Sequence, residues 1–449
     1  MRPQPALDVL IFGDGPAGLA CGLAGLAAGL KVALLSPASP RPRLPVGEHL
    51  PPKARTSLHR LGVTLPANSL RACASIAAWW GSDQARFTDY LFSPFGSGLN
   101  VLRPAFECAL QRTFADRGGH LPGPARPAAI RRQGGRFAVE FEGAPDLEAR
   151  WLIDATGRAS ALARRLGAKP IAYDRLIGLV ADLRAPARAP AGLVVEANAQ
   201  GWCYAVTLGG GGTRVVALTD ADLMPRAGRR ADLWRHLVGA GSVLRHLADA
   251  APPRVEVVSA RTQRLGRAGG EGWLAVGDAA MAFDPLASDG IAKALDDGIE
   301  AVAALAGGPD ALRRREARLA ERFDRYCQEH GVCYGLERRW PDRAFWRRRH
   351  AGAVASQPIV LDPEILLQRA TTRGGDDACR PLETEICFPL TDPEPVLRIA
   401  TRPLPAHVLV RHTRPIAALG ALTDRDRIRL VQTLLSIGAL RIVQQDTVV

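Results

Sequence analysis

The glycines near the start of the chain have a spacing that can hold a dinucleotide. Gly13, Gly15 and Gly18 follow the apolar run 9–12 and precede the alanine-rich run 19–30. In such a strand-turn-helix unit the first glycine permits a tight turn, the second lets a pyrophosphate approach the backbone, and the third lets helix and strand pack closely. The start of the helix also presents N–H groups to an anion. We therefore predict that the turn binds a dinucleotide through Gly13, Gly15, Pro16, Ala17 and Gly18.

The next predicted strand, 32–35, lacks the acidic residue that usually ends it and binds the adenosine ribose. Ser36 and Pro37 stand there instead. We expect Ser36 to make a weaker hydrogen bond to the ribose. A plain strand-turn-helix unit without a nucleotide is the alternative.

A second segment far along the chain has residues that suit the other end of a flavin cofactor. The apolar strand 273–276 ends in Gly277 and Asp278, and a loop containing Pro285 leads to a predicted helix at Gly290 and Ile291. A carboxylate at the end of a strand can accept hydrogen bonds from a polyol, and the start of a helix can donate N–H groups to ring carbonyls. We therefore predict FAD held at both ends.

The run Gly277 to Ala280, followed by Asp284-Pro285-Leu286 and Gly290-Ile291, resembles the FAD-dependent monooxygenases of the aromatic-hydroxylase and tryptophan-halogenase superfamily. This resemblance implies that Asp278 binds the ribityl chain and that Pro285 lies beside the flavin ring. It also implies that the backbone near Gly290 and Ile291 holds the pyrimidine end.

Three further stretches resemble the same superfamily and follow in its order. They are the Gly-Glu-His-Leu-Pro-Pro stretch 47–52, the helix-like stretch 102–110 and the strand-to-loop stretch 152–158. The resemblance implies that Arg103 lies against the cofactor and that Asp154 and Gly157 lie beside the dinucleotide. It covers roughly residues 7–330 and stops there.

The fold implied is α/β: a Rossmann-like FAD-binding domain of the glutathione-reductase and aromatic-hydroxylase type, interleaved with a mixed β-sheet substrate domain. A small C-terminal α+β module follows, with winged-helix-like strands at 395–399, 408–410 and 440–443 and helices at 415–422 and 424–435. The predicted boundaries are FAD domain 1–75, 101–170 and 263–330, substrate domain 76–100 and 171–262, and C-terminal region 331–449.

Composition narrows the class of protein. With 47% hydrophobic residues in 449, the chain can bury a large core, and we see no apolar run of membrane-spanning length. The first strand begins within about eight residues, which leaves no room for a signal peptide. The eight cysteines show neither a Cys-x-x-Cys nor a zinc pattern. We therefore expect a cytoplasmic protein with reduced thiols, no metal site and no membrane association.

The formal net charge of +13 comes almost wholly from arginine, because only four of the 58 basic residues are lysines. Residues 311–350 hold 12 arginines and six acids. Without a reading motif or aromatics placed for base stacking, we expect no nucleic-acid partner. An acidic protein surface is the better partner, docked at Arg347, Arg348 and Arg349, and a solvated helix face is the alternative.

The stretch between the cofactor segments separates the branches of the superfamily. Flavin-dependent halogenases carry a Trp-x-Trp-x-Ile-Pro signature where this chain has 202–207, and a relay lysine in a stretch where this chain has none between Lys53 and Lys169. Halogenation is therefore disfavoured and oxygen insertion is favoured. We expect a hairpin at 201–218 and the runs 79–82 and 90–98 near the reactive face of the flavin. At least one ring of Trp79 and Trp80 should face inward.

The closest resemblance is to halogenase-like flavoproteins that modify tryptophan in another protein. It implies peptidyl-tryptophan dihydroxylation with O2 on a small crosslinked peptide subunit, in cysteine tryptophylquinone biogenesis of quinohaemoprotein amine dehydrogenase. The alternatives are a small-molecule aromatic hydroxylase and a non-catalytic FAD-binding maturation subunit. The reductant, NAD(P)H or a partner reductase, stays open. His49 or Glu48 is the candidate base, and a histidine satisfied in a loop is the other interpretation of His49.

Overall fold

The structure is a computed structural model that describes residues 6–37, 48–184, 186, 188–225, 228–250, 252 and 254–355, and the strands 358–361, 385–389, 396–400, 404–405 and 440–442. The chain divides into two compact units, residues 1–321 and 322–449. The first contains both predicted flavin-binding segments.

The first sheet of unit 1 is built around a strand that is buried almost throughout. Strand β1 (Leu7–Phe12) pairs in parallel with β2 (Val32–Pro37) on one side and with β11 (Ala144–Asp154) on the other. The order within the described residues is β19-β20-β11-β1-β2-β8, with β9 and β10 added through β11. The other strands are β8 (Pro124–Ala125), β9 (Pro127–Gln133), β10 (Arg136–Phe141), β19 (Gly269–Gly270) and β20 (Trp273–Ala275).

Helix α1 (Pro16–Ala27) makes the crossover from β1 to β2, which confirms the strand-helix-strand prediction with shifted helix ends. Gly15 is its N-cap residue and Pro16 its first residue, a favoured place for proline. The helix ends early because Gly29 has a φ of +76°. There the Leu30 N–H bonds the carbonyl of Gly25, as in a glycine-terminated helix.

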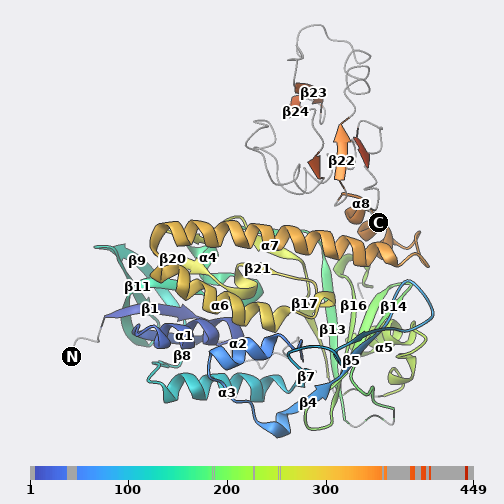
Figure 1. Ribbon diagram of the computed structural model, residues 1–449, viewed down its shortest axis with the longest axis horizontal. Coiled ribbons are helices and arrows are strands. Elements are labelled where there is room, and N and C mark those ends of the chain that lie inside the picture. The colour runs from blue at the N-terminus through green and yellow to red at the C-terminus, as the bar shows by residue number, and fades with distance from the viewer. Residues whose placement is uncertain are drawn as a thin grey trace. The chain divides into compact units, whose positions relative to one another are not determined.

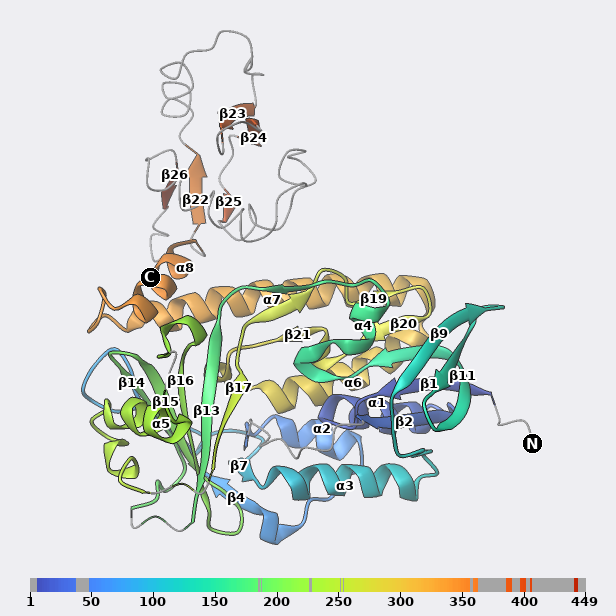
Figure 2. The same cartoon turned by 180° about the vertical axis from the view of Figure 1, so that it is seen from behind.

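Three long helices lie together beside this sheet, as Figures 1 and 2 show. Helix α1 packs against both α3 (Arg103–Asp116) and α6 (Gly290–Ala306), so the two predicted flavin-binding segments become neighbours. Shorter elements complete this part: β3 (His49–Leu50), α2 (Ala54–Arg60), β4 (Leu70–Cys73), β7 (Gly98–Val101), α4 (Ala161–Arg165), β12 (Pro170–Ala172), β18 (Gln263–Leu265) and β21 (Met281–Ala282).

The second sheet has the order β17-β13-β16-β15-β14-β5-β6 among the described residues. Its hairpin pairs Trp202 with Leu218, which confirms the predicted hairpin. Helix α5 (Arg230–Gly239) covers its outer face (Figure 1). The strands are β5 (Ser75–Trp79), β6 (Arg86–Asp89), β13 (Leu176–Leu183), β14 (Leu193–Asn198), β15 (Gly201–Thr207), β16 (Thr213–Asp220) and β17 (Val255–Ser259).

Helix α7 (Gly308–Leu336) continues from unit 1 into unit 2. Unit 2 also has α8 (Ala344–Ala355) and the strands β22 (Pro358–Leu361), β23 (Glu385–Pro389), β24 (Val396–Ala400), β25 (Leu404–Pro405) and β26 (Leu440–Ile442). Strands β24 and β26 fall on two of the predicted strands. The predicted helices 415–422 and 424–435 and the strand 408–410 lie outside the described residues.

Candidate active site

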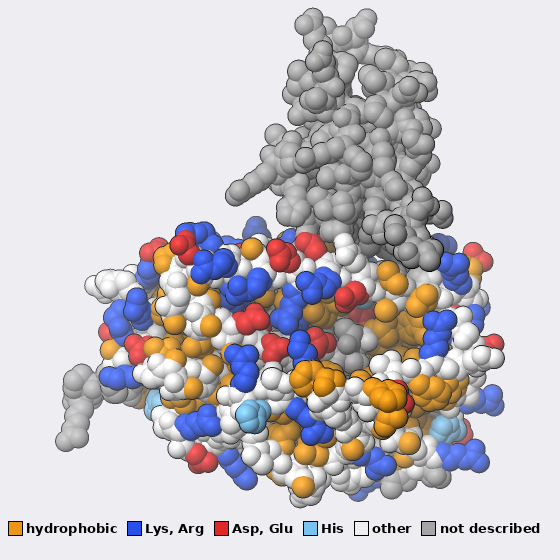
Figure 3. All heavy atoms as spheres, in the orientation of Figure 1, with side chains coloured by type: hydrophobic (Ala, Val, Ile, Leu, Met, Phe, Trp, Pro, Cys, Tyr) orange, Lys and Arg blue, Asp and Glu red, His pale blue; other side chains and the backbone are white. Residues whose placement is uncertain are grey.

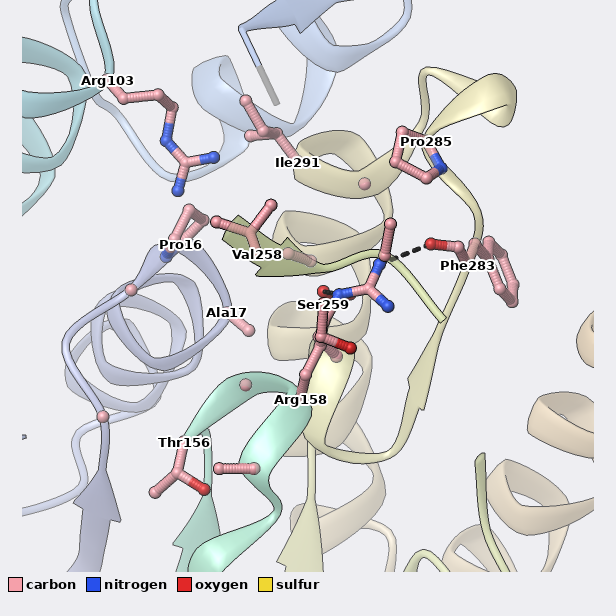
Figure 4. Close-up of a pocket in the computed structure, with 18 of the residues that line it drawn as sticks. Pro16, Ala17, Arg103, Thr156, Arg158, Val258, Ser259, Phe283, Pro285 and Ile291 are labelled. Carbon is pink, nitrogen blue, oxygen red and sulfur yellow. Dashed lines mark hydrogen bonds and ion pairs between the residues drawn. The ribbon is translucent and has the colours of Figure 1, made fainter. Parts of the chain in front are cut away.

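One cavity of about 1280 Å³ joins the glycine turn of the first sheet to the inner face of the second sheet. Its volume exceeds the roughly 300–1,000 Å³ of an ordinary small-ligand pocket, as a site for a dinucleotide and a substrate requires. Most of the predicted site residues line it: Gly13, Gly15, Pro16, Ala17, Ser36, Glu48, His49, Arg103, Gly157, Asp278, Pro285, Gly290 and Ile291. Figure 4 shows Pro16, Arg103, Ile291 and Pro285 around this space.

The glycine turn has room for a phosphate only at Gly15. A Cβ atom on Gly13 would lie 2.2 Å from the carbonyl oxygen of Ala155, and one on Gly18 would lie 1.9 Å from that of Gly13. A Cβ on Gly15 meets nothing within 4 Å. Gly13 and Gly18 therefore close the turn onto the protein, whereas Gly15 opens it to the cavity at the helix N-terminus. This arrangement fits the diphosphate of FAD.

Ser36 lines the cavity together with Asp14, a residue that no sequence pattern singled out. Its hydroxyl donates to Asp14 Oδ2 at 2.8 Å, and Gln111 Nε2 donates to the same oxygen at 3.3 Å. Asp14, from inside the glycine turn, also lines the cavity. An acidic group therefore does stand at the end of β2, supplied by the turn and not by the strand.

Asp278 lines the cavity between two cations. Its Oδ1 lies 3.0 Å from Lys293 Nζ and its Oδ2 lies 3.4 Å from Arg158 Nε. Burial alone would raise the pKa of this carboxyl, but Lys293 and then Arg158 hold it below its ordinary value. Arg158 also donates to the carbonyl of Phe283, the dashed line in Figure 4. Because α6 supplies Lys293, the helix that presents Gly290 also fixes the predicted ribityl acceptor.

Substituting Asp278→Ala should weaken FAD retention about tenfold to a hundredfold. It removes a charged acceptor, and a hydrogen bond to such a group contributes about 1.5–3 kcal/mol. The measurement is the FAD dissociation constant, with the exposed Asp310→Ala as the control for loss of one negative charge. Full FAD occupancy in Asp278→Ala under dilution would contradict this role.

Three of the predicted cofactor-binding residues, Gly18, Asp154 and Gly277, are not among the residues that line the cavity. Gly18 packs directly against the backbone of Gly13 and does not face the cavity. Asp154 is fully buried and accepts from Thr156 N, Thr156 Oγ1 and Ala163 N at 2.6–2.9 Å. Gly277 has a φ of +60° and donates its N–H to Asp297 at 2.6 Å. Asp154 and Gly277 therefore shape the loops that carry Gly157 and Asp278.

The inner face of the second sheet forms an apolar wall of the cavity. Side chains alternate along its strands, so even-numbered residues of β15 and β16 face the cavity and odd-numbered ones pack on α5. The wall is made by Gly178, Leu193, Val195, Trp202, Tyr204, Val206, Val216 and Leu218. Trp80 is buried and packs edge-on against Trp202 with centroids 6.1 Å apart, which confirms the predicted inward-facing ring.

Glu48 belongs to a buried polar network on this wall. Tyr204 Oη donates to its Oε2 at 3.1 Å and Arg214 Nη1 donates to its Oε1 at 2.8 Å. Arg214 also holds Asp182 through two bonds of 2.7 Å. Burial and then the charge of Glu48 raise the pKa of Tyr204 well above its ordinary value, so its phenol stays protonated.

Both ring nitrogens of His49 are engaged. Asn100 donates its Nδ2 to the carbonyl of Thr207 at 3.2 Å, which leaves its Oδ1 to accept from His49 Nδ1 at 2.9 Å. His49 Nε2 then accepts from the hydroxyl of Tyr90 at 3.1 Å. His49, in β3, thus has both ring nitrogens hydrogen-bonded among the described contacts, and it can act as a base only if Tyr90 releases Nε2.

We expect His49 to make folding less favourable at acid pH. Burial lowers its pKa in the folded state, against the Asn100 bond, which raises it. As pH falls through about 6.5, the unfolded chain gains a proton that the folded protein does not, so stability is lost at up to about 1.4 kcal/mol per pH unit. Denaturant titrations between pH 5 and 8 give the free energy of unfolding as a function of pH. The slope of this free energy against pH should be smaller for His49→Gln than for the parent, and the exposed His59→Gln provides the control variant. An unchanged slope in His49→Gln would contradict the pKa direction.

The structure bears on two predictions, the place of the run 90–98 and the docking role of Arg349. The run 90–98 does not line the cavity: Leu91 and Phe92 are 76% and 93% exposed. Arg349 is buried in unit 2, where its guanidinium lies 3.5 Å from the ring centre of Phe345. It is therefore unavailable for docking, although Arg347 and Arg348 are exposed.

Within the described residues, no group of three or more His, Cys, Asp or Glu side chains is placed to hold a metal ion. None of the helices within the described part of the chain is long and apolar enough to cross a membrane.

The glycine turn, the Asp278 loop and the joined second sheet define a flavoprotein with a two-part cavity. No known family profile matches the chain. It is 28% identical over 359 residues to the FAD-dependent oxidoreductase LodB of Marinomonas mediterranea, with 77% of this chain and 97% of LodB covered.

Two solved structures share the fold. The flavin-dependent halogenase CmlS is 18% identical with a TM-score of 0.67, and 97% of this chain and 96% of CmlS are covered. The peptidyl tryptophan dihydroxylase QhpG, essential for tryptophylquinone cofactor biogenesis, is 21% identical with a TM-score of 0.62, and 96% of this chain and 99% of QhpG are covered. The chain is an FAD-dependent oxidoreductase with the fold of these flavin-dependent enzymes.

Proposed function

We propose that this protein is an FAD-dependent monooxygenase that hydroxylates a tryptophan within a protein substrate, the dihydroxylation step of cysteine tryptophylquinone biogenesis in quinohaemoprotein amine dehydrogenase. The observation that carries the proposal is the single cavity that joins the FAD-binding residues to an apolar wall containing Trp202 and Tyr204. Such a wall suits an indole ring and keeps water from the reacting carbon. QhpG, whose fold this chain shares, is a peptidyl tryptophan dihydroxylase, and the substrate in this proposal is carried over from it.

Residues of this chain would bind the cofactor and hold the substrate beside it. The turn at Gly15 takes the diphosphate, Asp278 takes the ribityl hydroxyls, and the start of α6 at Gly290 takes the polar edge of the flavin ring. Bound FAD, once reduced by NAD(P)H or a partner reductase, activates O2 for transfer of one oxygen atom. The wall of the second sheet then positions the electron-rich ring for that transfer.

An exposed apolar segment supports a protein substrate. In the chain from β6 to β7, Phe87, Leu91, Phe92 and Phe95 are 45–93% exposed, and Tyr90 between them bonds His49 on the cavity wall. Hydrophobic side chains gather on the face seen in Figure 3, where the chain around β5 reaches the surface. Exposed apolar clusters often mark protein-binding sites.

The test compares a peptide containing the target tryptophan with free indole, each supplied with reduced FAD, O2 and bromide. We expect oxygen in the peptide, little reaction of free indole and no brominated product, because Lys53 is exposed and does not line the cavity. Phe92→Ser should raise the KM for the peptide, whereas Leu121→Ser, at an exposed apolar residue outside this segment, should leave it unchanged. Efficient turnover of indole alone would favour a small-molecule hydroxylase, bromination would favour a halogenase, and no turnover of either would favour a binding subunit.

A further inference from the structure

Tyr204 and Glu48 place a hydrogen-bonding pair on a cavity wall that is otherwise apolar along β14, β15 and β16. Tyr204 is 7% exposed and Glu48 is 2% exposed. The proton of the phenol is committed to Glu48 Oε2 at 3.1 Å, so the phenol oxygen keeps lone pairs for another donor. Both residues line the cavity. A ligand with a hydroxyl group would therefore find an acceptor at this place on the wall.

Arg214 fixes the position of the Tyr204–Glu48 pair from the side of Glu48 that is away from Tyr204. Arg214 binds the second oxygen of Glu48 at 2.8 Å and is itself fixed by two bonds to Asp182 on the neighbouring strand. With its carboxylate held from the other side by a buried guanidinium, Glu48 cannot turn away from Tyr204 without leaving that cation short of a partner. The direction of the bond from Tyr204 to Glu48 is thereby set by the fold.

We propose that Tyr204, oriented by Glu48, accepts a hydrogen bond from the hydroxyl of a singly oxygenated indole and so directs the second oxygenation of that ring. This inference rests on the proposed function. The unmodified ring has an N–H donor but no hydroxyl, so a hydrogen bond from the new hydroxyl to Tyr204 distinguishes the product of the first step from its substrate. An aromatic hydroxyl that donates its proton to an acceptor makes its ring more electron-rich, which favours oxygen transfer to a neighbouring carbon.

The stoichiometry is the same for the first and the second oxygenation of the ring. A ring C–H bond and the O–O bond of O2 break, and a ring C–O bond forms. One O2, two electrons from the reductant and two protons enter, and one ring hydroxyl and one water leave. Tyr204 changes neither the oxidant nor the reductant. Its effect is on how firmly the intermediate is held and on how reactive its ring is.

The first test is the ratio of doubly to singly oxygenated peptide made by the holoenzyme, read by mass. Tyr204→Phe should lower this ratio about tenfold or more, whereas Tyr173→Phe, whose phenol lies outside the cavity lining, should keep the parent ratio. Glu48→Gln should also lower the ratio. The amide can donate a hydrogen bond to the phenol oxygen of Tyr204, which turns the phenol proton toward the cavity and leaves a poorer acceptor for the hydroxyl of the ligand. A parent ratio in both Tyr204→Phe and Glu48→Gln, at normal FAD content, would overturn the inference.

The second test needs no peptide turnover. The holoenzyme should bind a hydroxyindole about threefold to tenfold more tightly than indole, the effect of one hydrogen bond, as read from the flavin absorbance. Tyr204→Phe should bind both equally. If the parent holoenzyme shows no preference for hydroxyindole, the inference fails. If the preference is present but the peptide is never oxygenated, the proposed function fails instead.

Discussion

The variant Gly15→Val is expected to be purified folded but without FAD. The Gly15 backbone has a φ of −77° and a ψ of −179°, which valine adopts freely, and a Cβ there meets no atom of the protein. The new side chain would instead fill the space that the diphosphate needs, at the point where N–H groups of α1 face the cavity. We expect FAD affinity to fall by more than about a hundredfold, as for the loss of two charge-assisted hydrogen bonds.

Two matched variants separate this effect from misfolding. Gly18→Ala should lose stability as well as FAD, because its Cβ would lie 1.9 Å from the Gly13 carbonyl oxygen. Gly239→Ala, at the end of α5, should change neither, because its Cβ would only touch Ala248 at 3.8 Å. Circular dichroism and FAD titration distinguish the three. Tight FAD binding by Gly15→Val would contradict the placement of the diphosphate.

Asp297→Ala is expected to destabilise the protein by about 3–5 kcal/mol, the cost of breaking a buried ion pair by removing one partner. Asp297 and Arg315 are 0% and 1% exposed and lie 2.6 Å apart. Asp297 also accepts from the N–H of Gly277, so its loss should loosen the loop that carries Asp278. Denaturant unfolding of the FAD-free protein measures the first effect and FAD affinity the second.

The exposed pair Asp310 and Arg313 provides the control, because Asp310→Ala should cost less than about 1 kcal/mol. The double variant Asp297→Leu and Arg315→Met should be more stable than Asp297→Ala, since no buried charge is left without its partner. A loss below about 1 kcal/mol in Asp297→Ala would mean that the pair is not buried as described.

The strand-turn-helix unit around Gly15 could be predicted because all its signals are local. The apolar run, the glycine spacing and the proline at the helix start each agree with one arrangement. The substrate hairpin was predictable for the same reason, since residues 201–218 alternate along adjacent strands.

The polar partners of the site could not be predicted from spacing. Tyr204 and Glu48 are 156 residues apart, and alternation in β15 indicates that Cys203 and Tyr204 face opposite sides without indicating which side holds the cavity. The aromatic run 90–98 was misplaced because its composition suits a pocket and an exposed docking segment equally well. Lys293, one of four lysines in the chain, carried no motif that linked it to Asp278.

The most direct test of the proposed monooxygenase activity is oxygen incorporation into the peptide substrate by the FAD-loaded protein. The protein is reduced without air and then mixed with isotopically labelled O2 and the crosslinked peptide subunit, and the product is analysed by mass. We expect two labelled oxygen atoms on the target tryptophan, and none with Gly15→Val. A peptide recovered without labelled oxygen, from protein shown to hold FAD and to be reoxidised by O2, would contradict the proposed activity.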